Sequence, residues 1–187
     1  MSHQCDHADP PLDDSKPSST AHHHRRSAAS AVPSAIITVS DTRTRETDTG
    51  GQRVFDLLSE AGHPVVHREI VPDEPEKIAG ALEALLDRGD ARAVILTGGT
   101  GVAPRDQTPE AVGPLLERVV PGFGELFRML SYEAVGSAAL LSRTLAGFSR
   151  GAVVFALPGS RGAVELGMQK LILPELGHLV AEALKAN

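Results

Sequence analysis

The sequence predicts an α/β protein of three layers, α/β/α, in which helices cover both faces of a mostly parallel sheet. Two observations support this class. Short β-branched apolar runs alternate with helical patterns along most of the chain. Apolar residues make up 41% of the 187 residues but aromatic residues only 3%, so the core must rest on Leu, Val, Ile and Ala. Such a core is typical of a sheet buried on both faces, and the length suits one domain.

The first half of the domain alternates strands and helices. Apolar residues recur at i, i+3 and i+4 in both helical segments, as Val54, Leu57 and Leu58 do in the first. Gly62 and Gly89 stand where the two helices should end. The predicted elements are a strand at 35–39, a helix at 51–62, a strand at 65–71, a helix at 74–89 and a strand at 93–97.

The second half begins with a helix whose N-cap we assign to Thr108, because Pro109 then occupies the first helical position. Gly113 and Pro114 are expected to interrupt this helix. The segment 122–136 is amphipathic, and its aromatic and Met side chains could pack on the sheet or form a subunit interface. The remaining predicted elements are a strand at 152–157 and a long helical pattern that reaches Leu184.

Residues 1–33 differ in composition from the rest, being rich in Ser, Pro, Asp and His. Such a segment cannot bury enough apolar surface to offset ordering, so we expect a disordered tail before a domain at 34–187. Its Cys and His residues could in principle hold a metal ion, but without a rigid frame we favour incidental affinity for metal. These residues are His3, Cys5, His7, His22, His23 and His24.

Charge and hydropathy exclude several classes of function. The net charge of −6 argues against a nucleic-acid partner, which would need clustered Lys and Arg. No apolar run approaches the roughly 20 residues of a membrane-spanning helix, and no apolar stretch marks the N-terminus for export. The only cysteine, Cys5, cannot form an intramolecular disulfide. We therefore expect a cytoplasmic protein that binds neither membranes nor nucleic acids.

Polar loops follow the predicted parallel strands, whose carboxyl ends form the usual ligand-binding edge of such sheets. In one of them Gly98, Gly99 and Gly101 come directly after a buried strand. Glycines leave backbone N–H groups unshielded, and such groups bind anions, of which phosphate is the obvious one. The spacing fits neither the dinucleotide-binding fingerprint nor a P-loop, and a simple tight turn explains the glycines about equally well.

Asp106 and Asp73 could bind a metal ion beside such a phosphate. A carboxylate near a phosphate repels it unless a cation lies between them, and Mg²⁺ is commonly held by one or two carboxylates and the substrate's phosphates. Asp106 follows the glycines, and Asp73 follows the strand at 65–71. Alternatively, Asp106 favours the helix dipole or pairs with Arg105, and Asp73 stands at a helix start.

The other loops supply further polar groups. Hydroxyls and acids between residues 40 and 49 could bind a polar heterocycle or merely form local turns. Pro158 and Gly159 form a turn before a helix cap at Ser160, which could equally be an ordinary strand-to-helix connection. The histidines of the domain lack the spacing of a zinc site, and no Gly-x-Ser-x-Gly nucleophile is present. The residues alone thus predict binding of a phosphorylated small molecule with Mg²⁺.

Several motifs resemble the MoaB/MogA family of molybdenum cofactor biosynthesis proteins, and its MoaB branch in particular. They are TGGTG at 97–101, PRDQTPEA at 104–111, VSDT, DTGG, VPDE, GFGELFRMLS, LLSRTLAG and ALPGS. The resemblance covers nearly all of residues 35–184. It implies a three-layer α/β/α molybdopterin-binding domain that assembles as a homotrimer or homohexamer. Active members of the family transfer AMP from Mg-ATP to the terminal phosphate of molybdopterin.

The resemblance also implies a role for each matching residue. Asp106 and Asp73 would be the catalytic carboxylates and would hold the Mg²⁺. Phosphate and nucleotide would be bound by Thr97, Gly98, Gly99, Thr100, Gly101 and Arg105. The pterin would be bound by Ser40, Asp41, Thr42, Asp48, Pro158, Gly159 and Ser160.

Other functions remain open on the sequence. A non-catalytic molybdopterin-binding or carrier protein is the first alternative, since some MoaB-branch proteins are not the main adenylyltransferase. An oligomeric scaffold is the second, with other cofactor-biosynthesis proteins as partners. A dehydrogenase-type nucleotide-binding enzyme is remote, because the G-x-G-x-x-G fingerprint is absent.

Overall fold

The computed structural model describes residues 31–185, so the predicted disorder and metal ligands of residues 1–30 lie outside the described residues. Val32 and Pro33 pack onto the domain, although we assigned them to the tail. The Val32 side chain is fully buried and its N–H donates to Nδ1 of His63 at 3.1 Å. The Pro33 carbonyl accepts the N–H of Arg92 at 2.7 Å. The folded domain therefore begins before Ser34.

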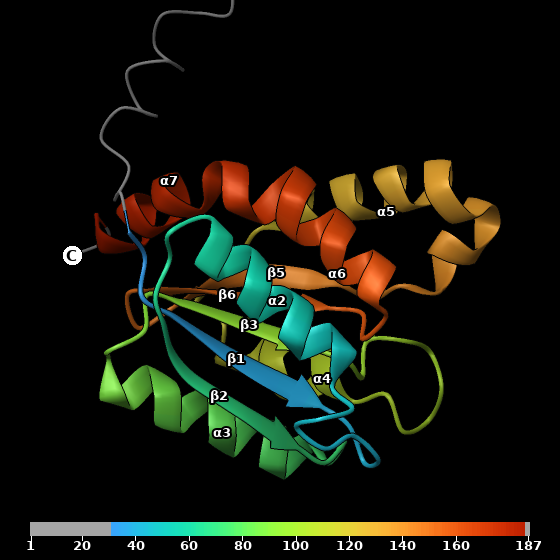
Figure 1. Cartoon of the computed structure of the whole chain (residues 1–187), viewed down its shortest axis with the longest axis horizontal. Coiled ribbons are helices and arrows are strands. Elements are labelled where there is room, and N and C mark those ends of the chain that lie inside the picture. The colour runs from blue at the N-terminus through green and yellow to red at the C-terminus, as the bar shows by residue number, and fades with distance from the viewer. Residues whose placement is uncertain (1–30, 186–187) are drawn as a thin grey trace, which may run out of the picture.

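A single sheet of six strands forms the middle layer (Figure 1). The strands are β1 (Ser34–Val39), β2 (Val65–Val71), β3 (Ala93–Thr97), β4 (Arg118–Val119), β5 (Leu145–Ser149) and β6 (Ala152–Leu157). Their order across the sheet is β2-β1-β3-β6-β5-β4. The first four in this order run parallel, whereas β5 is antiparallel to both β6 and β4. The predicted mostly parallel sheet is confirmed.

Strands β5 and β4 were not predicted from the sequence. β5 reads LAGFS, which is short and rich in small residues, and β4 has only two residues. A tight turn joins β5 to β6, and Arg150 and Gly151 both have positive φ there, 48° and 75°. A two-residue hairpin turn needs such angles, but arginine is not a residue that signals them.

Helices cover both faces of the sheet, which confirms the three layers (Figure 1). One face carries α2 (Thr49–Glu60), α5 (Pro121–Val135), α6 (Arg161–Gly167) and α7 (Leu173–Leu184), with the π-helical segment η3 (Met168–Ile172) between the last two. The other carries α3 (Pro75–Arg88) and α4 (Thr108–Val112). Side chains of neighbouring strand residues alternate between the two cores, so Ile36 lies in the α2 core and Ile37 in the α3 core. Among the helices of residues 31–185, none combines the length and the hydropathy of a membrane-spanning segment.

The predicted helices are confirmed with small shifts of their ends. The prediction of Thr108 as the N-cap of α4 is wrong. Gln107 precedes the helix, and Thr108 is its first residue. The Thr108 hydroxyl is not free to cap, because it donates to the carbonyl of Gly98 at 2.9 Å. The expected interruption is present, since α4 ends at Val112 and a 3₁₀ turn, η1 (Gly113–Leu115), follows.

Candidate functional site

At two positions of the glycine loop after β3, the backbone lies too close to neighbouring groups for a side chain. Gly98 has a φ of 109°, and a Cβ there would lie 2.2 Å from the carbonyl oxygen of Val39, at the end of β1. Gly99 has a φ of 61°, and a Cβ there would lie 2.4 Å from the Thr108 hydroxyl. Only glycine suits these two positions. The glycines therefore let the loop lie against both β1 and α4.

The carbonyl groups of this loop point into the protein. Thr108 holds the first two, donating from its hydroxyl to Gly98 at 2.9 Å and from its N–H to Gly99 at 3.0 Å. Arg143, a residue that the sequence analysis did not single out, donates to three further carbonyls between residues 100 and 106. The acceptors of the loop are thus largely used within the protein.

The N–H groups of the same loop are free. Within residues 31–185, the N–H groups of residues 99–102 donate to no acceptor. A row of unpaired N–H groups attracts anions, because each contributes a fixed positive partial charge. This is the geometry that the sequence predicted for phosphate.

Asp73 and Asp106 converge beside the loop, as predicted, and Asp41 joins them. The cavity between them measures about 130 Å³. It is lined by Val39, Ser40, Asp41, Thr42, Asp73, Gly99, Arg105 and Asp106. Backbone N–H groups orient all three carboxylates: that of Asp73 donates to Asp41 at 2.9 Å, that of Gln107 to Asp73 at 3.2 Å, and that of Ala103 to Asp106 at 2.9 Å.

The Asp73 carboxyl has an unfavourable environment for its charge. Burial raises its pKa, and the negative charges of Asp106 and Asp41 raise it further. The N–H of Gln107 and the charge of Arg105 act in the opposite direction. A cation placed between the carboxylates would relieve this repulsion.

The carboxylate oxygens of Asp73 and Asp106 suit a hard cation that is also bound by water or by the ligand. Within residues 31–185, no group of three or more His, Cys, Asp or Glu side chains has the arrangement of a complete metal site. Asp73 and Asp106 could therefore supply only part of the coordination sphere, and water or phosphate oxygens would complete it. Mg²⁺ is bound in this way in many phosphate-handling sites.

The loop after β6 extends the site on the side away from the carboxylates. Thr97 is buried, and its hydroxyl donates to the Pro158 carbonyl at 3.1 Å, which ties this loop to the glycine loop. Ser160 caps α6 by accepting the N–H of Ala163, as predicted. An apolar cavity of about 430 Å³ opens beside the loop. Its lining includes Thr100, Gly101, Phe127, Val135, Pro158, Ser160 and Leu166.

Residues 35–178 match a family model described as "probable molybdopterin binding domain". The chain belongs to this family. Molybdenum cofactor biosynthesis protein B of Bacillus anthracis is 55% identical to it over 148 residues, which cover 79% of this chain and 88% of that protein. A crystal structure of a molybdenum cofactor biosynthesis protein B is 51% identical and has a TM-score of 0.81, covering 84% of this chain and 99% of that chain. The tungsten cofactor synthesizing protein MoaB from Pyrococcus furiosus is 37% identical, with a TM-score of 0.73 over 83% of this chain and 99% of its own.

These similarities confirm the expected membership of the MoaB/MogA family and its α/β/α fold. They also confirm the likeness to the MoaB branch. The glycine loop, Asp73, Asp106, Arg105 and the two flanking loops meet at one edge of the sheet, as the family motifs imply.

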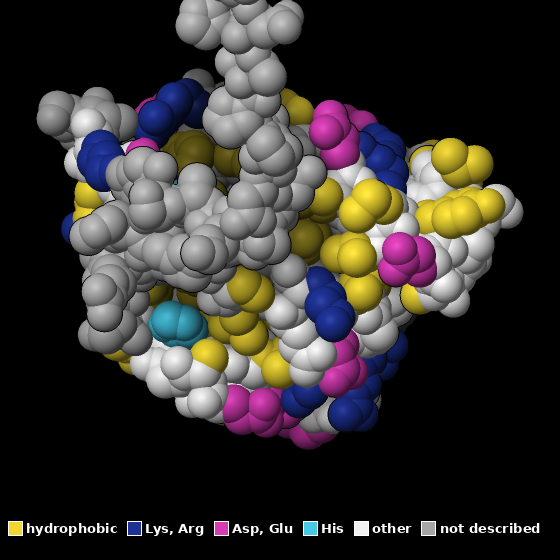
Figure 2. All heavy atoms as spheres, turned by 90° about the horizontal axis from the view of Figure 1, so that it is seen from above, with side chains coloured by type: hydrophobic (Ala, Val, Ile, Leu, Met, Phe, Trp, Pro, Cys, Tyr) yellow, Lys and Arg dark blue, Asp and Glu magenta, His cyan; other side chains and the backbone are white. Residues whose placement is uncertain are grey.

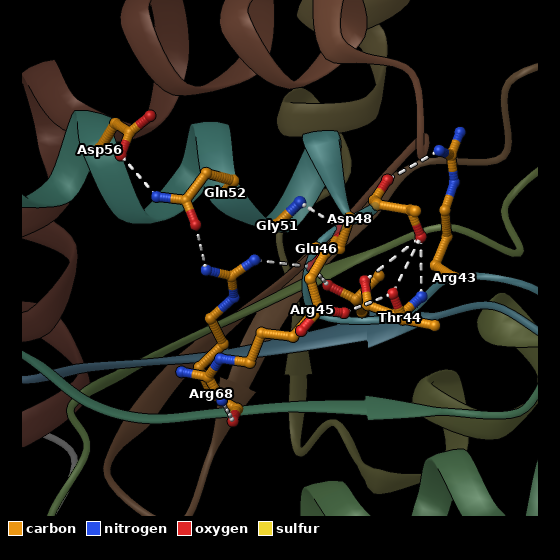
Figure 3. Close-up of polar contacts among 11 residues, drawn as sticks. Arg43, Thr44, Arg45, Glu46, Asp48, Gly51, Gln52, Asp56 and Arg68 are labelled. Atoms are coloured by element: carbon orange, nitrogen blue, oxygen red, sulfur yellow. Dashed lines mark hydrogen bonds and ion pairs between the residues drawn. The ribbon is translucent and has the colours of Figure 1, made fainter.

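Asp48 differs from the other residues that we assigned to the pterin. Its side chain is buried and used within the protein (Figure 3). It accepts hydrogen bonds from the N–H of Gly51, the hydroxyl of Thr38 and the guanidinium of Arg68, at 2.8, 2.8 and 2.9 Å. Asp48 therefore caps α2 and anchors it to β1 and β2, and it is not available to a ligand in this arrangement. The sequence could not reveal Arg68 as its partner, because 20 residues separate them.

Proposed function

We propose that this protein binds molybdopterin and transfers AMP from Mg-ATP to its terminal phosphate. One observation carries the proposal: the free N–H groups of residues 99–102 lie beside the converging carboxylates of Asp73 and Asp106. Such a site binds a phosphate and its accompanying cation. The names of relatives, among them the Bacillus anthracis protein, support a role in molybdenum cofactor biosynthesis.

This reaction needs no activated side chain. A terminal phosphate oxygen of molybdopterin attacks the α-phosphorus of ATP, the bond from that phosphorus to the bridging oxygen breaks, and pyrophosphate leaves with the bonding electrons. The protein has to align the two phosphates and offset their charge. The N–H groups of residues 99–102 would bind phosphate oxygens, and Arg105 lies at the carboxylate cavity to add positive charge.

Asp73 and Asp106 would hold Mg²⁺ through their carboxylate oxygens. Bound there, the ion would neutralise charge on the phosphates of ATP. Burial is the main cause of the raised pKa of Asp73, and repulsion by Asp106 and Asp41 adds to it. A cation would offset that repulsion, which supports this assignment. Asp41 lies in the same cavity, and its carboxylate accepts the backbone N–H of Asp73. We therefore propose that Asp41 orients Asp73, whereas the sequence led us to expect that Asp41 contacts the pterin.

The pterin has two candidate surfaces on either side of the glycine loop. Ser40 and Thr42 lie on one side, in the carboxylate cavity. Pro158, Gly159 and Ser160 lie on the other, next to the apolar cavity. The apolar cavity suits a flat ring system, since sites for such ligands are mostly apolar with a few polar groups at the rim.

The test is a direct assay with molybdopterin, Mg²⁺ and α-labelled ATP, in which adenylyl-molybdopterin is the labelled product. We expect Asp106→Asn and Asp73→Asn to lower the rate by about 10²–10³-fold, because they remove cation ligands without changing side-chain shape. Glu76→Gln, an exposed carboxylate in the first turn of α3, is the matched control and should react as the wild type. Full activity in folded Asp106→Asn would contradict the proposed role of that carboxylate.

A non-catalytic molybdopterin-binding protein is the second candidate. The free N–H groups of residues 99–102 and the apolar cavity beside them would serve this function equally, because they can bind molybdopterin without any transfer of AMP. The same assay separates the two functions. Tight binding of molybdopterin without labelled product would identify a carrier, whereas product formation would identify a transferase.

We also propose that the protein assembles as a homotrimer or homohexamer through α5 and the following 3₁₀ segment, η2 (Gly136–Leu141). Phe123 and Phe127 of α5 face the core, but the opposite side of this region is apolar and exposed (Figure 2). The exposed side chains are Leu126, Met129, Tyr132, Val135, Leu140 and Leu141. A patch of this kind marks an interaction surface. Light scattering should give a trimer or hexamer for the wild type and a smaller species for Tyr132→Glu, and a monomeric wild type would refute this assembly and weaken the scaffold alternative.

A further inference from the structure

We infer that Arg143 is the positioning residue that gives the glycine loop its anion-binding form. Its backbone N–H donates to the carbonyl of Thr100 at 2.9 Å. Its guanidinium donates from Nε to the carbonyl of Gly101 at 2.6 Å and from Nη2 to that of Asp106 at 2.5 Å. One residue thus holds three peptide groups of the same loop. The inference rests on the proposed function only in naming phosphate as the anion.

These contacts fix where the N–H groups point. In a trans peptide the C=O and the following N–H lie in one plane and point in opposite directions, and residues 31–185 contain no cis peptide bond. When the carbonyls of Thr100 and Gly101 turn toward Arg143, the N–H groups of Gly101 and Val102 must turn away from it. Those two N–H groups are among the free donors of the loop.

The third contact acts on a carboxylate. The carbonyl of Asp106 shares its peptide plane with the N–H of Gln107, and this N–H donates to Oδ1 of Asp73 at 3.2 Å. Arg143 therefore orients both the anion-binding donors and a hydrogen bond to one of the two candidate Mg²⁺ ligands. It does so from the protein side of the loop, so it is not itself a contact to the substrate.

The guanidinium is held in place by its own partner. Its Nη1 pairs with Glu110 in the first turn of α4, and about one third of the Arg143 side chain is exposed. A planar guanidinium can serve Glu110 and two carbonyls at once, whereas a lysine ammonium acts as a single point charge on a flexible stem. Arg143→Lys should therefore keep the charge and lose the alignment.

The first experiment needs no ligand, and it follows hydrogen exchange of the backbone N–H groups by NMR. In Arg143→Lys the Asp106 peptide is released, so the N–H of Gln107 should exchange about tenfold faster than in the wild type. Arg88→Lys changes an exposed arginine paired with Asp90 and is the matched control, which should leave this exchange unchanged. Unchanged exchange of the Gln107 N–H in Arg143→Lys would overturn the inference.

The second experiment measures binding of Mg-ATP by calorimetry. We expect about 10- to 100-fold weaker binding for Arg143→Lys at a near-normal melting temperature, since lost charge-assisted alignment affects the loop more than the core. Arg143→Ala should bind more weakly still, and a low concentration of guanidinium ion should restore part of the affinity. Loss of affinity only in parallel with unfolding, without rescue, would show a purely structural role. If the wild type binds no Mg-ATP, the proposed function fails, and the exchange experiment alone decides the role of Arg143.

Discussion

Two polar loops at the carboxyl edge of the sheet differ in how they use their polar groups. The loop after β1, residues 40–48, is rich in Ser, Thr and Asp, and its side-chain oxygens accept N–H groups of its own backbone. Ser40 accepts those of Thr42 and Arg43, and Thr47 accepts that of Thr44. The loop after β3 satisfies its carbonyls and leaves the N–H groups of residues 99–102 free. The first uses most of its N–H groups within the protein, whereas the second leaves a continuous row of them open to an anion.

This difference shows that polar composition does not identify a binding loop. What matters is which polar groups remain unpaired after folding, because a satisfied group offers nothing to a ligand. Asp48 and Asp106 illustrate the point. Both are aspartates that precede a helix, but one is buried with three partners and the other faces a cavity with one.

The largest expected effect is on stability, and it compares the buried Asp48 with the cavity-facing Asp106. Asp48→Ala removes one partner of a buried ion pair, since the side chains of Asp48 and Arg68 are only 2% and 6% exposed. We expect a loss of about 3–5 kcal/mol in the free energy of unfolding, because the charge of Arg68 is left uncompensated. Asp106→Ala should cost only about 1 kcal/mol, the value of one hydrogen bond from Ala103. Urea denaturation of both variants measures the contrast, and equal losses would break it.

The next effect tests whether the open loop depends on its glycines. Gly98→Ala would place a Cβ 2.2 Å from the carbonyl oxygen of Val39 in a backbone conformation with φ of 109°. We expect about 3 kcal/mol of destabilisation together with weaker phosphate binding. Gly80→Ala is the control, because this position in α3 has open space and an ordinary helical backbone. It should stabilise by about 0.5–1 kcal/mol, and a similar loss in both variants would contradict the argument from close approach.

The architecture and the meeting of most candidate site residues at one edge of the sheet could be predicted from the sequence for identifiable reasons. The parallel strands are continuous apolar runs, and a helical period is local, so both are visible along the chain. The glycines and Asp73 and Asp106 stand at strand ends, and topology alone brings strand ends together. Contacts between distant residues have no such signal. Arg143 lies 42 residues from Gly101 and 37 from Asp106, so no local pattern in the sequence predicts its hydrogen bonds to their carbonyls. The same holds for the burial of Asp48 by Arg68.

The smallest expected effect lies at the opposite edge of the sheet, where His63 accepts the N–H of Val32 through Nδ1. Burial lowers the pKa of His63, so the folded state favours the neutral ring that can accept this bond. An unfolded histidine titrates near pH 6.5. The contribution of His63 to stability is therefore fully present above about pH 6.5 and is lost as the pH falls through the lower pKa of the folded state.

Melting temperatures between pH 7.5 and 5 should fall less steeply in His63→Asn, whose amide oxygen can accept the bond without titrating. Mg-ATP binding by the loop after β3 at pH 7.5 should be the same in both proteins, because His63 lies at the amino ends of the parallel strands, away from that loop. An identical pH slope in the variant would show that the Val32 contact does not depend on the neutral ring.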